Sequence, residues 1–184
     1  MSETERLLRT GSVHFTPMHP ADPIARRCVA QYFSELSRRF EHGFDAAQSI
    51  PVDDDQLLPP RGVFLVGTLD GEAVACGCIK TVAPGVGYLK RMWVAESARG
   101  MGLGRRTLQE LEAAARTLGF TRLCLETNRA LTEAIALYRS SGYREVEPFN
   151  AEPYAHHWFE KNIEPSRRPP ARPVDRTGRR FRTS

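Results

Sequence analysis

The sequence predicts one domain of mixed α+β class, built on a central, mostly antiparallel β-sheet of about six to seven strands. Its 184 residues are enough for a single domain with its own hydrophobic core. Apolar periodicity changes along the chain in the order β-α-β-β-β-α-β-α-β-β, with turn residues between the runs. The strand-helix-strand passage in the second half implies one parallel connection in the sheet.

A short strand near residues 13–15 opens the first half, because apolar and polar residues alternate there. Asp22 can cap the helix that follows, since Pro23 suits the first helical position and apolar residues then recur at helical spacing. We expect this helix to end by Gly43. The stretch 44–61 is rich in Asp and Pro, which predicts a loop.

Three antiparallel strands follow this loop. Residues 62–68 and 72–82 are β-rich and are separated by Asp70 and Gly71, a pair typical of a tight hairpin turn. Another turn leads to a third apolar run at 88–94. This third strand ends shortly before a glycine-rich stretch of the chain.

The second half alternates helices and short strands. The expected elements are a helix at 103–118 closed by Gly119, a strand at 123–125, a helix at about 130–140 closed by Gly142, and strands near 143–146 and 156–159. A glycine just after the last apolar position of a helix is typical of a C-terminal cap. Both helices therefore have a predicted end as well as a predicted apolar face.

The positive charge of the chain is concentrated at its C-terminal end. Lys and Arg number 26 against 22 Asp and Glu, but residues 165–184 hold seven of the arginines and one of the acids. This segment is also rich in proline and poor in apolar residues, so it cannot bury enough surface to become ordered. We expect a single domain at 1–164 and a disordered tail at 165–184. A solvated tail is favoured over a nucleic-acid-binding arm, so nucleic acid is not an expected partner.

Cysteine usage and the N-terminal segment indicate a cytoplasmic protein. The four cysteines lie in apolar runs without the spacing of a zinc site, which predicts reduced packing residues and no bound metal. The N-terminus has no apolar leader, and no window reaches the roughly 18 apolar residues of a membrane span. We therefore expect no membrane partner, while exposed sheet edges leave a homodimer open.

Residues 99–104, Arg-Gly-Met-Gly-Leu-Gly, join the strand at 88–94 to the helix at 103–118. Glycines let the backbone approach a bulky anion and adopt positive φ, and the first N–H groups of a helix point at such an anion. Arg99 and Arg105 add positive charge. The stretch therefore predicts a diphosphate-binding turn, and a plain tight turn with exposed arginines is the alternative.

Two other types of glycine loop fit less well. A nucleoside-triphosphate loop ends in Gly-Lys-Ser or Gly-Lys-Thr, whereas Gly104 is followed by two arginines. A dinucleotide fold needs Gly-x-Gly-x-x-Gly, and here the glycines stand at 100, 102 and 104. A dinucleotide oxidoreductase is therefore only a remote alternative, although Glu126 follows the turn at a suitable distance.

The pattern Arg-x-x-Gly-x-Gly at 99–104 resembles the acyl-CoA-binding motif of the GNAT superfamily of N-acetyltransferases. The stretch Ala-Ile-Ala-Leu-Tyr at 134–138, followed by Gly-Tyr at 142–143, is similar to a second signature of that family. The resemblance spans residues 13–161 and is least specific in the first third of the chain. It implies a GNAT-like fold, in which about four helices flank the sheet and a parallel strand pair splays apart at the CoA site.

The resemblance implies an N-acetyltransferase that moves the acetyl group of acetyl-CoA to a primary amine by direct attack in a ternary complex. Acetyl-CoA is then the co-substrate, and no metal is needed. A small-molecule amine is the favoured acceptor, because the chain is compact and shows no docking module. The alternatives are a protein N-terminal or lysine acetyltransferase and a non-catalytic acyl-CoA-binding regulatory module.

By the same resemblance, the backbone of the strand before the glycine turn pairs with the pantetheine arm, and the turn faces the pyrophosphate. Asn128 either caps the next helix or contacts the cofactor. The expected cofactor-binding residues are Met92, Trp93, Val94, Arg99, Gly100, Met101, Gly102, Leu103, Gly104, Arg105, Asn128 and Tyr138.

Two residues, Tyr138 and Glu126, are predicted to be catalytic. The family usually places a tyrosine near the CoA sulfur at the position of Tyr138, which makes this phenol the expected general acid for the departing thiolate. A primary amine is mostly protonated near neutral pH, so its attack needs a base or desolvation. Related proteins often carry an acid where this chain has Tyr88, which leaves Glu126 as the best carboxylate. Water relayed from a backbone carbonyl is the alternative base.

Acceptor-binding residues are expected in the parts that vary with substrate across the family. The candidates are Arg38, Arg39, Glu41, His42 and Asp45 near the end of the first helix, and Tyr154, His156, His157 and Trp158 near the last strands. Adjacent residues of a strand face opposite ways, so His156 and His157 cannot both line one pocket. The arginines suggest an acceptor that bears a carboxylate or a phosphate, and a plain surface role is the alternative.

Overall fold

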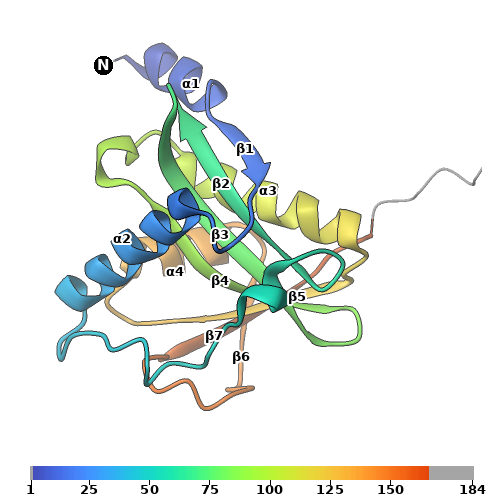
Figure 1. The fold of residues 1–184 in the computed structure, drawn as a ribbon. Coiled ribbons are helices and arrows are strands. Elements are labelled where there is room, and N and C mark those ends of the chain that lie inside the picture. The colour runs from blue at the N-terminus through green and yellow to red at the C-terminus, as the bar shows by residue number, and fades with distance from the viewer. Residues whose placement is uncertain (1, 166–184) are drawn as a thin grey trace, which may run out of the picture.

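The computed structural model describes residues 2–165, so the predicted disorder of the 165–184 tail lies outside the described residues. Within this part, one seven-stranded sheet has the order β1-β2-β3-β4-β5-β7-β6 (Figure 1). Its β4–β5 pair is parallel and its other pairs are antiparallel, which confirms the predicted mixed α+β class. The strands are β1 (His14–Pro17), β2 (Gly62–Leu69), β3 (Glu72–Ala83), β4 (Val86–Val94), β5 (Arg122–Thr127), β6 (Arg144–Val146) and β7 (His157–Asn162).

The helices agree with the sequence except at the N-terminus. The α-helices within residues 2–165 are α1 (Glu3–Gly11), α2 (Pro23–Arg39), α3 (Leu103–Leu118) and α4 (Thr132–Ser140), and the short 3-10 turns are η1 (Asp54–Leu57) and η2 (Glu96–Ala98). The predicted ranges of α2, α3 and α4 are confirmed to within a few residues. From the sequence we expect no element before residue 13, whereas Ser2 and Glu5 form a capping box at the start of α1 through reciprocal hydrogen bonds of 2.7 and 3.2 Å.

The helices pack on both faces of the sheet (Figure 1). α3 and α4 cover one face, where Leu111 and Ile135 join the largest core cluster with Leu123 of β5. α2 covers the other face, where Cys28 packs with Cys76 of β3 in a second cluster. Because the sheet is covered on both sides, β2 and the middle of β3 are buried at nearly every position.

The strands β4 and β5 separate after a short parallel contact. Their paired positions end at Tyr88 and Cys124, while β4 stays paired with β3 as far as Val94 and β5 stays paired with β7 as far as Thr127. Beyond this point, no strand within residues 2–165 pairs with the facing edges of β4 and β5. The expected splayed parallel pair is therefore confirmed, and it opens a cleft between the two strands.

A β-bulge shapes β4 at the edge of this cleft. One residue of β3, Gly77, faces two residues of β4, Arg91 and Met92. Arg91 has a φ of 54°, a left-handed conformation that is uncommon for a residue other than glycine. Its guanidinium carbon lies 5.4 Å from the centroid of the Phe33 ring, so the bulge directs this side chain toward α2.

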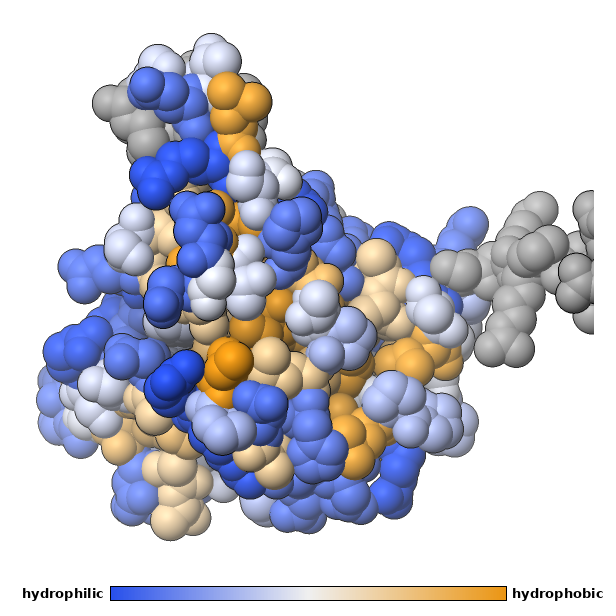
Figure 2. Space-filling view, turned by 45° about the horizontal axis from the view of Figure 1, so that its top comes forward, coloured by the Kyte–Doolittle hydropathy of each residue, from blue (hydrophilic) through white to orange (hydrophobic). Residues whose placement is uncertain are grey.

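Hydrophilic residues cover most of the face shown in Figure 2, and hydrophobic residues are visible mainly in the middle of the view. Among the described residues, the large hydrophobic side chains that are clearly exposed are Leu8, Val82 and Phe149, which come from separate parts of the chain. No helix in the described part of the chain is long and apolar enough to cross a membrane.

Candidate active site

The glycine turn begins helix α3 and presents backbone N–H groups. Gly100 and Gly102 have φ values of 74° and 76°, and Gly102 is the N-cap residue of α3. The hydrogen bond from the N–H of Arg106 to the carbonyl of Gly102, 3.1 Å long, starts the helix, so the N–H groups of residues 103–105 precede it. A Cβ atom added at Gly100 or Gly102 would meet no other atom within 4 Å. The turn therefore offers N–H groups and open space at the positive end of a helix, as a diphosphate site requires.

Arg99 and Arg105 are held beside this turn by neighbouring side chains. Arg99 donates from Nη2 to Oε2 of Glu35 at 2.5 Å and to the carbonyl of Val94 at 3.2 Å. Arg105 donates from Nη2 to Oγ of Ser140, at the end of α4, at 2.8 Å. Both positive charges thus stand at the start of α3, each fixed by a contact with another element.

Arg39 links the two helices that border the cleft. It forms an ion pair with Glu133 of α4, and its Nη2 donates to the carbonyl of Ala130 at 3.0 Å. The hydrogen bond from Arg39 lowers the pKa of the Glu133 carboxyl, so this carboxyl stays ionised. The contact holds the end of α2 against the start of α4.

Two adjoining cavities occupy the cleft. The larger cavity, of about 580 Å³, lies beside the glycine turn and is bordered by α2, the end of β4 and α4. The smaller cavity, of about 140 Å³, is bordered by α2, β4, β5 and the loops that contain residues 44–52 and 152–155. The residues that line both cavities are Tyr32, Leu36, Met92, Leu131 and Ala134. A long ligand anchored at the turn can therefore extend toward the smaller cavity.

Two tyrosine side chains line the cleft where the cavities meet. Tyr138 of α4 lines the smaller cavity and Tyr32 of α2 lines both. Within residues 2–165, neither hydroxyl has a hydrogen-bond partner. Burial raises the pKa of both phenols, and the charge of Glu126 raises it further, so both stay protonated. The sequence singles out only Tyr138, because Tyr32 stands at the helical spacing of a core residue.

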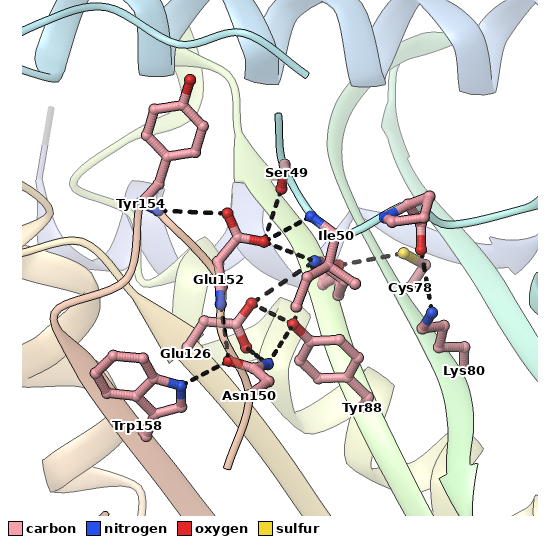
Figure 3. A network of polar contacts seen from close by, with 12 residues as sticks. Ser49, Ile50, Cys78, Lys80, Tyr88, Glu126, Asn150, Glu152, Tyr154 and Trp158 are labelled. Atoms are coloured by element: carbon pink, nitrogen blue, oxygen red, sulfur yellow. Dashed lines mark hydrogen bonds and ion pairs between the residues drawn. The ribbon is translucent and has the colours of Figure 1, made fainter. Parts of the chain in front are cut away.

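Glu126 of β5 belongs to a buried polar network that joins the two splayed strands (Figure 3). Its carboxylate accepts a hydrogen bond from the hydroxyl of Tyr88 on β4 and lies 3.6 Å from Nζ of Lys90. Asn150 donates from Nδ2 to the Tyr88 hydroxyl at 3.1 Å, and Trp158 donates from Nε1 to Oδ1 of Asn150 at 2.8 Å. The network fixes the carboxylate in the wall of the smaller cavity.

The environment of Glu126 suits a base. Only 6% of its side chain is exposed, and this burial raises the pKa of the carboxyl, while the ammonium of Lys90 and the hydroxyl of Tyr88 lower it in part. A carboxylate with a raised pKa accepts a proton more readily near neutral pH. Glu126 can therefore take a proton from an ammonium group that enters the smaller cavity.

Glu152 is a second buried carboxylate in this cavity. It accepts hydrogen bonds from the hydroxyl of Ser49 at 2.9 Å, the N–H of Ile50 at 2.8 Å and the N–H of Tyr154 at 3.4 Å. Nζ of Lys90 lies 3.9 Å away. Glu152 thus ties two loops together at one end of the cavity, through contacts that no local sequence pattern reveals. Within residues 2–165, no group of three or more His, Cys, Asp or Glu side chains could hold a metal ion.

The structure brings most of the predicted cofactor-binding residues together. Those that line the larger cavity are Met92, Trp93, Val94, Arg99, Gly100, Gly102, Leu103, Gly104 and Arg105. Met101 is instead buried in a core cluster. Asn128 lines the smaller cavity, but its Nδ2 donates to the carbonyl of Tyr154 at 2.8 Å and its Oδ1 accepts from the N–H of Ala130 at 2.9 Å. Asn128 therefore orders the loop before α4, and its contact with a cofactor stays a prediction.

Few of the predicted acceptor-binding residues border the cavities. Arg39 lines the larger cavity and Tyr154 the smaller one. Trp158 reaches the polar network through Asn150. The candidates that line neither cavity are Arg38, Glu41, His42, Asp45, His156, His157 and Trp158.

Comparisons with known proteins agree with this geometry. Residues 29–143 match the model of the acetyltransferase (GNAT) family. An IAA acetyltransferase of Azospirillum brasilense is 38% identical over 122 residues, which are 66% of this chain and 80% of that protein. A solved structure from Klebsiella pneumoniae, provisionally assigned as an acyl-CoA N-acyltransferase, has a TM-score of 0.65 and 28% identity, over 82% of this chain and 97% of that one. A GNAT family acetyltransferase from Elizabethkingia anophelis with acetyl-CoA bound shares the fold, with a TM-score of 0.56 and 16% identity over 83% of this chain and 99% of that one.

Proposed function

This chain belongs to the GNAT family of acetyltransferases and is an acyltransferase, and from that premise we propose the reaction that its cleft performs. It moves the acetyl group of acetyl-CoA to a primary amine of a small molecule, by direct attack while both substrates are bound. One observation carries this proposal. The glycine turn borders one of two adjoining cavities, Glu126 borders the other, and Tyr32 lines both.

For each step of this reaction, the cleft contains a residue that can bind the substrate or transfer the proton. Acetyl-CoA, when bound, supplies an activated acetyl group, and the N–H groups of residues 103–105 together with Arg99 hold its diphosphate. Glu126 takes the proton of the incoming ammonium group, so that the nitrogen lone pair can attack. Tyr138, with Tyr32 beside it, gives a proton to the departing sulfur. A C–N bond forms as the C–S bond breaks, and the second proton that the nitrogen loses returns to the Tyr138 phenolate, which leaves an acetamide and the thiol of CoA.

The size of the smaller cavity supports a small acceptor. Its volume is about 140 Å³, and it adjoins the larger cavity through shared lining residues, so a small molecule fits between them. A peptide or an aminoglycoside would fill much more space. The Azospirillum relative, whose name specifies the single compound IAA, is consistent with an acceptor of small size.

Incubation of the full chain with acetyl-CoA and a panel of amino acids, polyamines, aminoglycosides and peptides tests this function. Mass spectrometry should detect free CoA and one acetylated small molecule in equal amounts. The Glu126→Gln protein is the matched control, because it separates enzymatic transfer from spontaneous acetylation of amines. Acetylation of peptides alone, or no acetylated panel member, would overturn the proposed acceptor class.

A further inference from the structure

The smaller cavity has an aromatic wall. Phe33 comes from α2, Phe40 and Phe44 come from the segment after it, and Tyr154 comes from the loop before β7. The ring centroid of Phe44 lies 4.9 Å from that of Tyr154 and 5.1 Å from that of Phe33. Rings at these distances form one continuous apolar surface, which favours a flat apolar group on the ligand.

Arg91 adds a positive charge to the same cavity. The β-bulge places its guanidinium over the ring of Phe33, as part of the cavity wall. Arg39 and Arg99 both form ion pairs with Glu35, whereas Arg91 forms none with any residue from 2 to 165. A guanidinium in a cavity wall that has no carboxylate partner in the protein can bind a carboxylate of the ligand through two parallel hydrogen bonds.

An acidic cluster borders the same cavity. Glu126 and Glu152 lie on either side of Lys90, whose Nζ is 3.6 Å from one carboxylate and 3.9 Å from the other. Two carboxylates share one ammonium in this cluster, so the ammonium group of an acceptor finds a carboxylate partner there. The cavity therefore offers an acidic cluster for an amine, a cation for an anion and an aromatic surface for a ring.

We propose that the acceptor is an aliphatic primary amine that also carries an aromatic ring and a carboxylate, with the amine at Glu126, the ring against Phe33, Phe44 and Tyr154, and the carboxylate on Arg91. An amino acid with an aromatic side chain is the simplest molecule of this class. The assignment rests on the proposed acetyl transfer, since it names the amine that receives the acetyl group. It also predicts that the protein prefers acceptors with both a ring and a carboxylate. A cleft with only an acidic cluster would not show this preference.

A matched set of acceptors tests this assignment. Phenylalanine carries all three groups, phenethylamine lacks the carboxylate, and alanine lacks the ring. Phenylalanine should be acetylated with a kcat/KM roughly 10- to 100-fold above that of phenethylamine, as expected for a bond to a charged group. Its kcat/KM should also exceed that of alanine, because its ring buries apolar surface. The Arg91→Gln variant should lose the advantage of phenylalanine over phenethylamine but keep its advantage over alanine, because alanine carries the same carboxylate. A cooperative thermal unfolding transition shows that the variant folds. The Arg27→Gln variant, altered on the exposed side of α2, should behave as the wild type.

Calorimetry of phenylalanine binding in the presence of CoA tests the ligand class separately from the transfer reaction. Binding that depends on Arg91 without any acetylated product would overturn the transfer reaction while supporting the ligand class of the cavity. Acetylation of phenethylamine as fast as of phenylalanine would overturn the ligand class while leaving the transfer reaction intact. Absence of both binding and product would overturn both.

Discussion

Tyr88 of β4 donates a hydrogen bond to the carboxylate of Glu126 on β5, across the point where the two strands separate. The last parallel pair joins Tyr88 to Cys124, so Glu126 lies two residues beyond the contact and reaches the cavity. Burial raises the pKa of Tyr88, and the charge of Glu126 raises it further, so the phenol stays protonated and remains a donor. Tyr88 thus positions the carboxylate and does not act as the base itself.

Replacing Glu126 with Gln should lower kcat/KM by roughly 10²- to 10⁴-fold, because an amide cannot accept the ammonium proton. The wild-type rate should fall on the acid side, where Glu126 becomes protonated. Burial raises the pKa of this carboxyl, so the fall should occur at a higher pH than for an exposed glutamate. The dependence of kcat/KM on pH measures this, and the variant should lack the acid limb.

Glu110→Gln is the matched control for this experiment. Glu110 pairs with Arg106 within α3 and lines neither cavity, so the variant should keep the wild-type rate and pH profile. An acid limb that persists unchanged in the Glu126→Gln protein would identify another group as the base.

Replacing Tyr138 with Phe should lower kcat by roughly 10²-fold and leave the KM for acetyl-CoA nearly unchanged, because only the proton donor is lost. Tyr32→Phe, made in parallel, shows which of the two phenols protonates the sulfur. Tyr143→Phe is the control, since its hydroxyl donates to Oε1 of Glu112 at 3.2 Å in the core. This control should lose about 1 kcal/mol of unfolding free energy and keep its kcat. Wild-type rates in both cleft variants, with chemistry limiting turnover, would exclude both donors.

The sequence predicts best those parts of the fold that are determined by a few adjacent residues. Helix α3 occupies Leu103–Leu118 as expected, and glycines with positive φ stand at both of its ends. The hairpin between β2 and β3 turns at Asp70 and Gly71, whose φ values are 50° and 83°. Such turns depend on a few adjacent residues, so a short stretch of sequence predicts them. Helix α1 also has a local signal, the capping box of Ser2 and Glu5, which the predicted order of elements leaves out.

The candidate site is harder to predict, because its residues are brought together by strand separation and by long connections. Glu126 and Tyr138 are predicted from their place in motifs, and their catalytic roles stay predictions. Tyr32 looks like a core residue until the cleft beneath α2 is known. Glu152 binds a loop about a hundred positions earlier in the chain, and Arg91 enters the cavity because of a bulge opposite Gly77. Pairing over such distances leaves no periodic trace in the sequence.

Replacing Gly102 with Val should weaken acetyl-CoA binding by roughly 10-fold or more, because the side chain strains the left-handed backbone and fills the open space at the turn. Gly119→Val is the matched control at the other end of α3, where φ is 87° and a Cβ also meets nothing within 4 Å. Both variants should lose similar stability in thermal unfolding, but only Gly102→Val should change the Kd measured by calorimetry. An equal Kd in the two variants would mean that the turn does not bind the diphosphate.

Replacing Glu152 with Gln should loosen one end of the smaller cavity. One carboxylate oxygen accepts from Ser49 and Ile50 and the other accepts from Tyr154, whereas an amide has only one accepting oxygen. We expect a loss of about 1 to 3 kcal/mol in unfolding free energy, measured by chemical denaturation. The KM for the acceptor should rise more than the KM for acetyl-CoA, because the loosened loops border the smaller cavity. Ser49→Ala, which removes one donor and keeps the carboxylate, should show a smaller change in the same direction. Unchanged stability and unchanged KM values in Glu152→Gln would mean that this carboxylate does not hold the two loops.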